Sequence, residues 1–460
     1  MQGAEPNVSA VSNRELLSQI LRLAGPMVIA GLVQTVYHII NALWVGRLGA
    51  NAVAVVSICL PINLLMISLG GGLSLAGSIL IAQSIGAKRH DDVNKVAAQT
   101  LTCLSGFSVA LSVAGYFLAP QILVLMGVDV SIFEATLSYL RITFASALVL
   151  TLSSAAIAIL RGMGESKAPL PIILSSVIIN AVLDPILIFG WGPIAAIGVT
   201  GAAYATLITQ LITAVLGLQL MLQARFGLRI CLPDLLPDWP MIGQIFRLGV
   251  PASIEHSMQA VVLSIMTVLV TAFGTVAVAA YGIVFRLYSF AIIPAFSISM
   301  AVSILVGQSI GAGNISLAIR MTRIAALFNF AMMSVMSVVV FLSAEAIINL
   351  FVPGDIQLVT SGSFVLRVFM LSMPLIAILL SLRGAFRGAG DTFNTMVLTL
   401  AGIWLNQIPL AYLLSRPSFW GEYGLWYSQL AGAVLNVVIA VVYFNSHHWL
   451  KKCTVAGSAI

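Results

Sequence analysis

The chain has 460 residues, of which 60% are hydrophobic and only 8% charged, and its formal net charge is +6. Soluble domains carry about 25% charged residues, so this composition excludes an ordinary water-soluble enzyme. The basic residues lie in short stretches between long apolar runs, which fits membrane orientation and does not indicate nucleic-acid binding. About 20 apolar residues cross a bilayer as one helix, whereas barrel strands show shorter alternating segments, so the composition predicts an all-α integral membrane protein.

The apolar runs predict 12 transmembrane helices in chain order. The first six are expected near 23–45, 52–81, 96–118, 135–158, 169–190 and 196–222, and the second six near 248–270, 277–306, 319–343, 358–382, 394–415 and 424–446. Pro61 and the glycines at 70–72 are expected to interrupt the second span. The proline-rich stretch 225–246 predicts a cytoplasmic linker between an N-terminal six-helix bundle (1–224) and a C-terminal one (247–460).

The two predicted bundles are copies of one sequence. QSIGA occurs at 83–87 and again at 308–312, and 24 of the 66 residues in 22–87 are identical at this offset of 225. RGMGES at 161–166 is echoed by RGAGDT at 387–392, at offset 226. Internal repeats set architecture. Because each copy has an even number of spans, the copies enter the membrane from the same side, which predicts a pseudo-twofold axis along the membrane normal and substrate binding near mid-depth.

The basic residues predict the orientation of the chain. With a cytoplasmic N-terminus, 16 of the 21 Lys and Arg residues fall on the cytoplasmic side, the five others being Arg47, Arg141, Arg286, Arg367 and Arg416. This satisfies the positive-inside rule, so we expect both termini in the cytoplasm. The first twenty residues lack a basic segment followed by an apolar core, so no cleaved signal peptide is expected.

The four cysteines, Cys59, Cys103, Cys231 and Cys453, show no CxxC or metal-ligand spacing. Two lie in apolar runs and two in segments predicted to be cytoplasmic. We therefore expect no disulfide.

Short motifs in a fixed order carry a resemblance to a known family. They are VGRLG at 45–49, QSIGA at 83–87, RGMG at 161–164, and Asn180 with Asp184-Pro185 in the fifth span. In this order and placement, over nearly the whole chain, they resemble the multidrug and toxic compound extrusion (MATE) family. The resemblance implies a V-shaped pair of bundles that exports amphipathic, often cationic compounds in exchange for H⁺ or Na⁺. It also implies a monomer in the cell membrane, the inner membrane if bacterial, without another cofactor.

Two acidic residues lie deep in the apolar runs, Asp184 and Glu255. An ionisable group at mid-bilayer costs about 2.5–3.5 kcal/mol, so such groups are usually functional. Asp184 follows Asn180 by four residues, which places both on one helix face, and a carboxyl group in a low dielectric takes up a proton readily. The resemblance places a cation site on this pair. At offset 226 Asn180 corresponds to Asn406 but Asp184 to Leu410, so the acid is not a shared scaffold residue.

The first span carries a polar stripe of Gln34, His38 and Asn41. Gln34 is repeated as Gln259, whereas His38 and Asn41 belong to the first copy alone. Many members of the resembling family carry aspartate where Asn41 stands, and since asparagine cannot titrate, ion coupling would rest on Asp184 with neutral ligands. His38 either titrates near neutral pH or packs as a hydrogen-bonded residue.

Tyr37 and Thr206 resemble family positions that line the same cavity. The predicted cation-coupling residues are therefore Asp184, Asn180, Asn41, His38 and Thr206. The predicted substrate-cavity residues are Tyr37, Gln34, Glu255, Gln259 and Arg286.

Glu255 lies one turn before Gln259, the position at which another branch of the resembling family has a cation-binding glutamate. Glu255 is either such a ligand or an interface acid paired with His256 or Arg286. Arg286 replaces Pro61 of the first copy and is either a counter-ion for Glu255 or a charge that repels substrate. An unpaired buried charge is costly, which favours the pairing.

The chain contains no Walker motif, HExxH or nucleophile elbow, so we expect neither ATP hydrolysis nor another enzyme activity. One alternative is a lipid-linked oligosaccharide flippase of the related fold, which would need several basic residues in its cavity; the candidates are Arg286, Arg141 and Arg367. A passive channel would show a continuous symmetric polar lining, and a membrane-embedded enzyme an acid/base or metal cluster. The interpretation we favour is a secondary exporter of small-molecule drugs, coupled to H⁺ or Na⁺ at Asp184.

Overall fold

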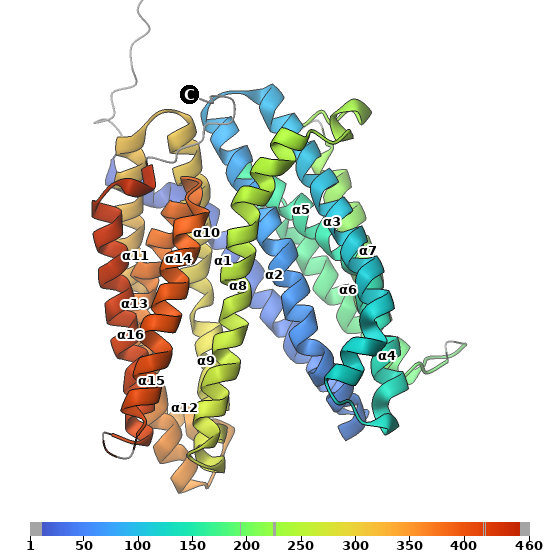
Figure 1. Cartoon of the computed structure of the whole chain (residues 1–460), viewed down its shortest axis with the longest axis vertical. Helices are drawn as coiled ribbons and strands as arrows, with labels where there is room; N and C mark the ends of the chain where they lie inside the picture. The colour runs from blue at the N-terminus through green and yellow to red at the C-terminus, as the bar shows by residue number, and fades with distance from the viewer. Residues whose placement is uncertain (1–11, 194, 224–226, 417, 419, 451–460) are drawn as a thin grey trace, which may run out of the picture. The chain divides into compact units, whose positions relative to one another are not determined.

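A computed structural model describes residues 12–450 except 194, 224–226, 417 and 419 (Figure 1). Every regular element in this part of the chain is a helix. The first half contains α1 (Asn13–Gly46), α2 (Ala50–Gly86), α3 (His90–Leu125), α4 (Val130–Ala145), α5 (Ala147–Gly162), α6 (Leu170–Phe189) and α7 (Val199–Met221). A short 3₁₀ turn, η2 (Leu232–Leu235), precedes the second half. There follow α8 (Trp239–Thr271), α9 (Thr275–Ala291), α10 (Ile293–Gly311), α11 (Ile315–Leu342), α12 (Ala344–Phe351), α13 (Ile356–Gly388), α14 (Thr392–Ala401), the π-helix η3 (Gly402–Gln407), α15 (Ile408–Leu414), α16 (Glu422–Asn445) and the 3₁₀ turn η4 (His448–Leu450).

The helices confirm the predicted all-α membrane fold. Within the described residues, 11 helices are long and apolar enough to cross a membrane, and the number rises to 12 when α4 and α5, which meet at 41°, count as one span. The predicted span 277–306 is divided into α9 and α10 at Ile292. Pro294 lies in the first turn of α10, and a proline there is compatible with a helix start because it lacks an N–H group.

The predicted interruption of the second span is wrong. α2 continues as one helix of 37 residues through Pro61 and the glycines at 70–72. Gly72 in this stretch, and Gly77 beyond it, serve helix packing instead. A Cβ on Gly72 would lie 2.7 Å from the carbonyl oxygen of Gly249 on α8, and one on Gly77 would lie 2.5 Å from the Thr100 Oγ1 atom on α3. Small residues at these positions let helix backbones approach closely.

The helices form two compact units. The N-unit consists of residues 29–257, and the C-unit consists of the chain up to residue 28 together with the chain from residue 258 onward. Each unit therefore contains the start of a helix that the sequence repeat assigns to the other copy. The bundle boundaries at 224 and 247, which follow the repeat, stay a prediction.

Hydrogen bonds and burial at the starts of α1 and α8 explain this exchange of helix ends. In the C-unit, the Arg320 Nε atom on α11 donates to the Asn13 Oδ1 atom at the start of α1 over 2.9 Å, and Ile20 is fully buried. In the N-unit, the Ser253 hydroxyl on α8 donates to the Leu69 carbonyl oxygen of α2 over 3.0 Å.

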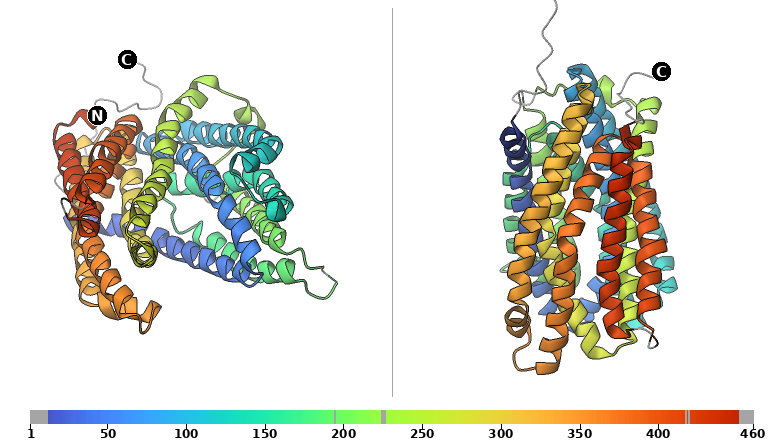
Figure 2. Two further views of the ribbon diagram at one scale, coloured as in Figure 1. Left: turned by 60° about the horizontal axis from the view of Figure 1, so that its bottom comes forward. Right: turned by 90° about the vertical axis from the view of Figure 1, so that its left-hand side faces the viewer.

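Each unit has its own apolar core. In the C-unit, α13 packs against α9, α10, α11 and α16, and Figure 2 shows α11, α13 and α16 side by side in its right-hand view. The core there includes Phe369, Met373 and Trp426. In the N-unit one cluster includes Leu80, Leu104 and Ile245, with Ile245 supplied by the start of α8.

The described part of the predicted linker folds onto α3. The amide nitrogen of Gln99, a residue only 1% exposed, donates to the carbonyl oxygens of Asp234 (2.7 Å) and Leu236 (2.6 Å), and its amide oxygen accepts from the Asp238 N–H (2.9 Å). Lys95 forms an ion pair with Asp238, and its hydrogen bond holds the pKa of the Asp238 carboxyl below its usual value.

Cys59, Cys103 and Cys231 are free thiols, the first two buried and the third exposed. Cys453 lies outside the described residues, as do Arg225 and the basic pair at 451–452. No disulfide joins the three described cysteines, and the expectation for the whole chain stays a prediction.

Candidate functional site

Asp184 and Asn180 are buried together on one face of α6. Their exposed fractions are 0% and 1%. Among the described residues, neither carboxylate oxygen of Asp184 nor either polar atom of the Asn180 amide has a hydrogen-bond partner. A buried polar group without a partner costs about 1–3 kcal/mol, and more if it is charged. The pair therefore has the chemistry of a site that takes up a proton or a small cation.

α1 and α7 bring further polar groups to this pair. The Tyr37 hydroxyl on α1 lies 3.3 Å from Thr206 Oγ1 on α7. The Asn41 side chain is also near the Tyr37 hydroxyl, and Asp184 is close enough to interact electrostatically with Tyr37. The His38 ring packs edge-on against Tyr37 with 5.1 Å between centroids and is exposed. The predicted residues of the first copy thus gather around α6, with His38 at the margin.

A cavity of about 180 Å³, here called the N-cavity, lies beside this group in the N-unit. Gln34, Tyr37 and Thr206 line it, as predicted from the sequence. Ser176 and Val177 also line it, and since they precede Asn180 by four and three residues, Asn180 lies on the same face of α6 one turn further on. Among the described residues that line the N-cavity, none is acidic or basic.

The remaining predicted residues lie elsewhere. Glu255 is buried in the part of α8 that belongs to the N-unit. Gln259, one turn later, lines a second cavity in the C-unit. Arg286 on α9 is exposed and is not among the residues that line that cavity. Because Glu255 and Arg286 belong to different units, their ion pair stays a prediction.

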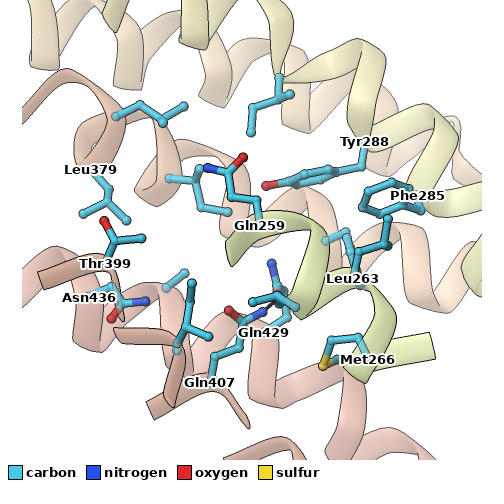
Figure 3. A pocket seen from close by; sticks show the side chains of 18 of the residues that line it. Gln259, Leu263, Met266, Phe285, Tyr288, Leu379, Thr399, Gln407, Gln429 and Asn436 are labelled. Atoms are coloured by element: carbon cyan, nitrogen blue, oxygen red, sulfur yellow. Dashed lines mark hydrogen bonds between the residues drawn. The ribbon is translucent and has the colours of Figure 1, made fainter. Parts of the chain in front are cut away.

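The second cavity, here called the C-cavity, has a volume of about 360 Å³. Figure 3 shows its lining, with Tyr288 and Phe285 on one side and the Gln407, Gln429 and Asn436 amides on another. The Gln407 Nε2 atom donates to the Gln429 Oε1 atom over 2.7 Å.

The N-cavity and the C-cavity occupy equivalent positions in the two sequence copies. Offset 225 pairs Gln34 with Gln259, and offset 226 pairs the α5 residues of the N-cavity with α13 residues of the C-cavity. Offset 223 pairs Thr206 with Gln429 in α7 and α16. At these offsets every residue that lines the N-cavity, except Ser176, has a counterpart that lines the C-cavity.

Close helix contacts show which residues of α6 correspond to which residues of α14, η3 and α15 in the second copy. In the N-unit a Cβ on Gly201 would clash with the Leu187 carbonyl oxygen, and in the C-unit a Cβ on Gly424 would clash with the Leu414 carbonyl oxygen. Gly201 and Gly424 are 223 residues apart, whereas Leu187 and Leu414 are 227 residues apart. The offset of 226 that holds before η3 therefore becomes 227 after it, because a π-helix accommodates one extra residue.

This register corrects the predicted pairing. Asn180 corresponds to Gln407, and Asp184 corresponds to Ala411, which is fully buried; the prediction of Leu410 is wrong by one residue. The conclusion drawn from it holds, because the acid again has an apolar counterpart.

Sequence reasoning missed most of the lining residues, among them Thr209 and Arg383. Thr209 lines the N-cavity, and its buried hydroxyl has no partner among the described residues. Arg383 lines the C-cavity, although the sequence suggested a place on the cytoplasmic side. The repeat contained a signal for Arg383, because offset 226 places it opposite Ile157 in an apolar run. Among the described residues, no group of three or more His, Cys, Asp or Glu could hold a metal ion.

Duplicated halves, membrane-length helices and a polar cavity in each unit define a polytopic membrane transporter. The MatE family model matches residues 26–186 and 251–413, one match in each copy. The chain therefore belongs to the MATE family of multidrug efflux transporters.

Curated relatives cover nearly the whole chain. The probable multidrug resistance protein YoeA of Bacillus subtilis is 30% identical, with 93% of each chain covered. The probable multidrug resistance protein NorM of Thermotoga maritima is 24% identical, with 97% of this chain and 96% of NorM covered.

Solved structures share the fold. An outward-facing multidrug resistance MATE transporter gives a TM-score of 0.87 at 23% identity, covering 97% of this chain and 99% of that one. A MATE protein in the bent conformation also gives 0.87, at 24% identity, with 96% and 99% covered.

Proposed function

We propose that the protein exports amphipathic, cationic drugs or toxic organic compounds from the cell by antiport against H⁺ or Na⁺. The observation that supports this proposal is the buried Asp184–Asn180 pair, whose polar atoms have no partner among the described residues. Relatives named as multidrug resistance proteins support the substrate class. We further propose that it acts as a monomer in the cell membrane with both termini in the cytoplasm.

The groups around Asp184 suit a coupling ion. An isolated buried carboxylate is too costly to keep, so a proton or a cation must neutralise it. Pro185 in α6 lacks an N–H group and cannot donate to the Ala181 carbonyl oxygen, which frees a backbone acceptor in the same turn. The Asn180 amide oxygen, one turn away on α6, and the Thr209 hydroxyl, which lines the N-cavity, are further neutral oxygens without a partner among the described residues. Together they offer either a proton acceptor or oxygen ligands for Na⁺.

Exchange follows from competition for one negative charge. An opposite charge about 4 Å from a carboxylate gains about 4 kcal/mol at an effective dielectric constant near 20. An organic cation in the N-cavity is attracted by ionised Asp184, and a bound H⁺ or Na⁺ removes that attraction. A ligand shifts a conformational equilibrium only if it binds the two states unequally, and neutralisation of a buried acid provides such a difference.

The test measures efflux of a fluorescent organic cation from proteoliposomes under a proton gradient and, separately, under a sodium gradient. Asp184→Asn keeps the shape but removes the titratable group, so we expect gradient-driven efflux to fall by at least about tenfold, as for loss of a charge-assisted contact. Glu134→Gln, which removes an exposed acid from α4 of the same unit, should leave efflux unchanged. Full gradient-driven efflux by Asp184→Asn would refute the proposal, and the two gradients identify the ion.

A further inference from the structure

The two cavities share one architecture but differ in charge. The N-cavity lies beside Asp184 and has no charged residue among the described residues that line it. In the C-cavity Arg383 occupies the position of Ile157, and Thr399 that of Ile173. The acid's counterpart there is Ala411. The second copy has therefore gained a basic residue in its cavity lining and lacks the acid that lies beside the N-cavity.

Arg383 is placed to act on a ligand in the C-cavity. It lies one turn after Leu379 and Leu380 on α13, which also line the cavity, so the three side chains share one helix face. The Tyr288 hydroxyl is near enough to interact with its charge. No acidic residue is found among the described residues that line the C-cavity.

Amide groups extend this polar side of the cavity. The Gln429 side-chain oxygen accepts from Gln407, and the NH₂ group of the same amide supplies two N–H donors. Asn406 Nδ2 donates to the Asn436 Oδ1 atom over 3.3 Å, so the Asn436 NH₂ group is likewise a donor. In Figure 3 the Gln259 amide and the Tyr288 hydroxyl point toward the same space.

Another part of the C-cavity wall is aromatic. Tyr281, Phe285 and Tyr288 of α9 and Phe369 of α13 line it. The Tyr288 and Phe369 rings meet edge to face with 5.7 Å between centroids, and the Phe285 and Tyr288 rings stack at 6.3 Å. Aromatic surfaces of this kind hold a flat ring by stacking and edge contacts.

We propose that the C-cavity is a second ligand site, which binds an aromatic compound that carries a carboxylate. The ring lies against the aromatic wall, and the carboxylate accepts hydrogen bonds from Arg383 and from the amides. A guanidinium fork matches a carboxylate in geometry and charge, and the volume lies at the lower end of the range of about 300–1,000 Å³ for small-molecule sites. Through this site the transporter would accept anionic or zwitterionic aromatic compounds as well as cations.

Binding to the purified full-length protein tests the site, with three naphthalene probes of one shape: naphthoate, its methyl ester and naphthylmethylammonium. We expect naphthoate to bind more tightly than the other two. Arg383→Gln should weaken naphthoate by at least about tenfold and leave the ester unchanged, whereas Arg383→Lys should retain part of the affinity. Arg367→Gln, on the same helix but beside Phe341, is the charge-matched control.

Three outcomes would overturn the proposal: equal binding of naphthoate and its ester, equal loss of both in Arg383→Gln, or the same loss in Arg367→Gln. Thermal unfolding of each variant distinguishes a damaged fold from a lost contact. Asp184→Asn should bind naphthoate as the wild type does, so failure of the coupling scheme and failure of this site give different results.

Discussion

Gly71 and Gly72 are neighbours in α2 with opposite surroundings. A Cβ on Gly72 would meet the backbone of α8 at Gly249 and Ser253, whereas one on Gly71 would meet nothing within 4 Å. Gly72→Val must push α2 and α8 apart, and overpacking of this kind costs about 1–3 kcal/mol. We expect Gly72→Val to lower the thermal unfolding temperature of the purified protein, with little change in Gly71→Val. Equal unfolding temperatures for the two variants would show that the α2–α8 contact does not limit stability.

Among single residues, the sequence predicted those site residues that depend on local spacing. Asn180 and Asp184 share a helix face because they are four residues apart, and the polar stripe of α1 follows from the same periodicity. The exposure of Arg286 could not be predicted, because it depends on how α9 packs against its neighbours. Arg383 was missed for a related reason, since a basic residue near the end of an apolar run is usually assigned to a loop.

In the linker, one side chain, Gln99, makes three hydrogen bonds to the backbone. Gln99→Leu would leave the carbonyl oxygens of Asp234 and Leu236 and the Asp238 N–H without their partner, and each hydrogen bond contributes about 0.5–1.5 kcal/mol. We expect hydrogen exchange of residues 232–238 to accelerate by about tenfold or more. Thr102→Val, which removes one exposed bond to the Leu235 carbonyl oxygen, should produce a smaller change. No acceleration in Gln99→Leu would mean that the linker is held by other contacts.

The stability of the linker is expected to depend on pH through Asp238. The hydrogen bond from Lys95 lowers the pKa of Asp238, so its stabilising contribution is present above the usual carboxyl pKa and is lost as pH falls through the lowered value, below about pH 4. We expect Lys95→Met to reduce this dependence of linker exchange on acid, while the Met241 N–H, which also donates to the Asp238 carboxyl, retains part of it. An unchanged acid response in Lys95→Met would assign it to another carboxyl group.

Helix positions were predictable from apolar runs, but helix irregularities were not. Residues 394–415 gave one predicted span, which the structure divides into α14, η3 and α15. The extra residue of η3 arises where Gly402 lets the Asn436 side chain approach closely. Such a contact joins segments far apart in the sequence, so periodicity within one helix carries no signal of it. The aligned pairs after η3 were therefore displaced by one residue.

In the whole molecule, the two copies carry cavities with corresponding linings but different side chains. Sequence repeats predicted that the copies share a scaffold, and the matched linings of the N-cavity and C-cavity agree with that. Gln34 is preserved as Gln259 in the second cavity, whereas Ile157 is replaced by Arg383. We therefore expect the positions at which the repeat is broken to distinguish the ligands of the two cavities.

The orientation of the whole chain in the membrane can be tested from two ends of one helix. Arg229 N donates to Asn94 Oδ1 over 3.0 Å, so the exposed Cys231 lies near the start of α3, while Val130, 90% exposed, follows its end. A helix of 36 residues is about 54 Å long at 1.5 Å per residue, enough to separate these positions across a bilayer.

With Cys453→Ser as background, a membrane-impermeant maleimide should label Cys231 in inside-out vesicles but not in intact cells, because the positive-inside rule places the linker in the cytoplasm. Val130→Cys combined with Cys231→Ser should give the reverse pattern. Cys59 and Cys103 are buried and should stay unlabelled in both preparations, which the Cys231→Ser and Cys453→Ser double variant checks. Labelling of Cys231 in intact cells would reverse the orientation, and with it the side from which each cavity must receive its ligand.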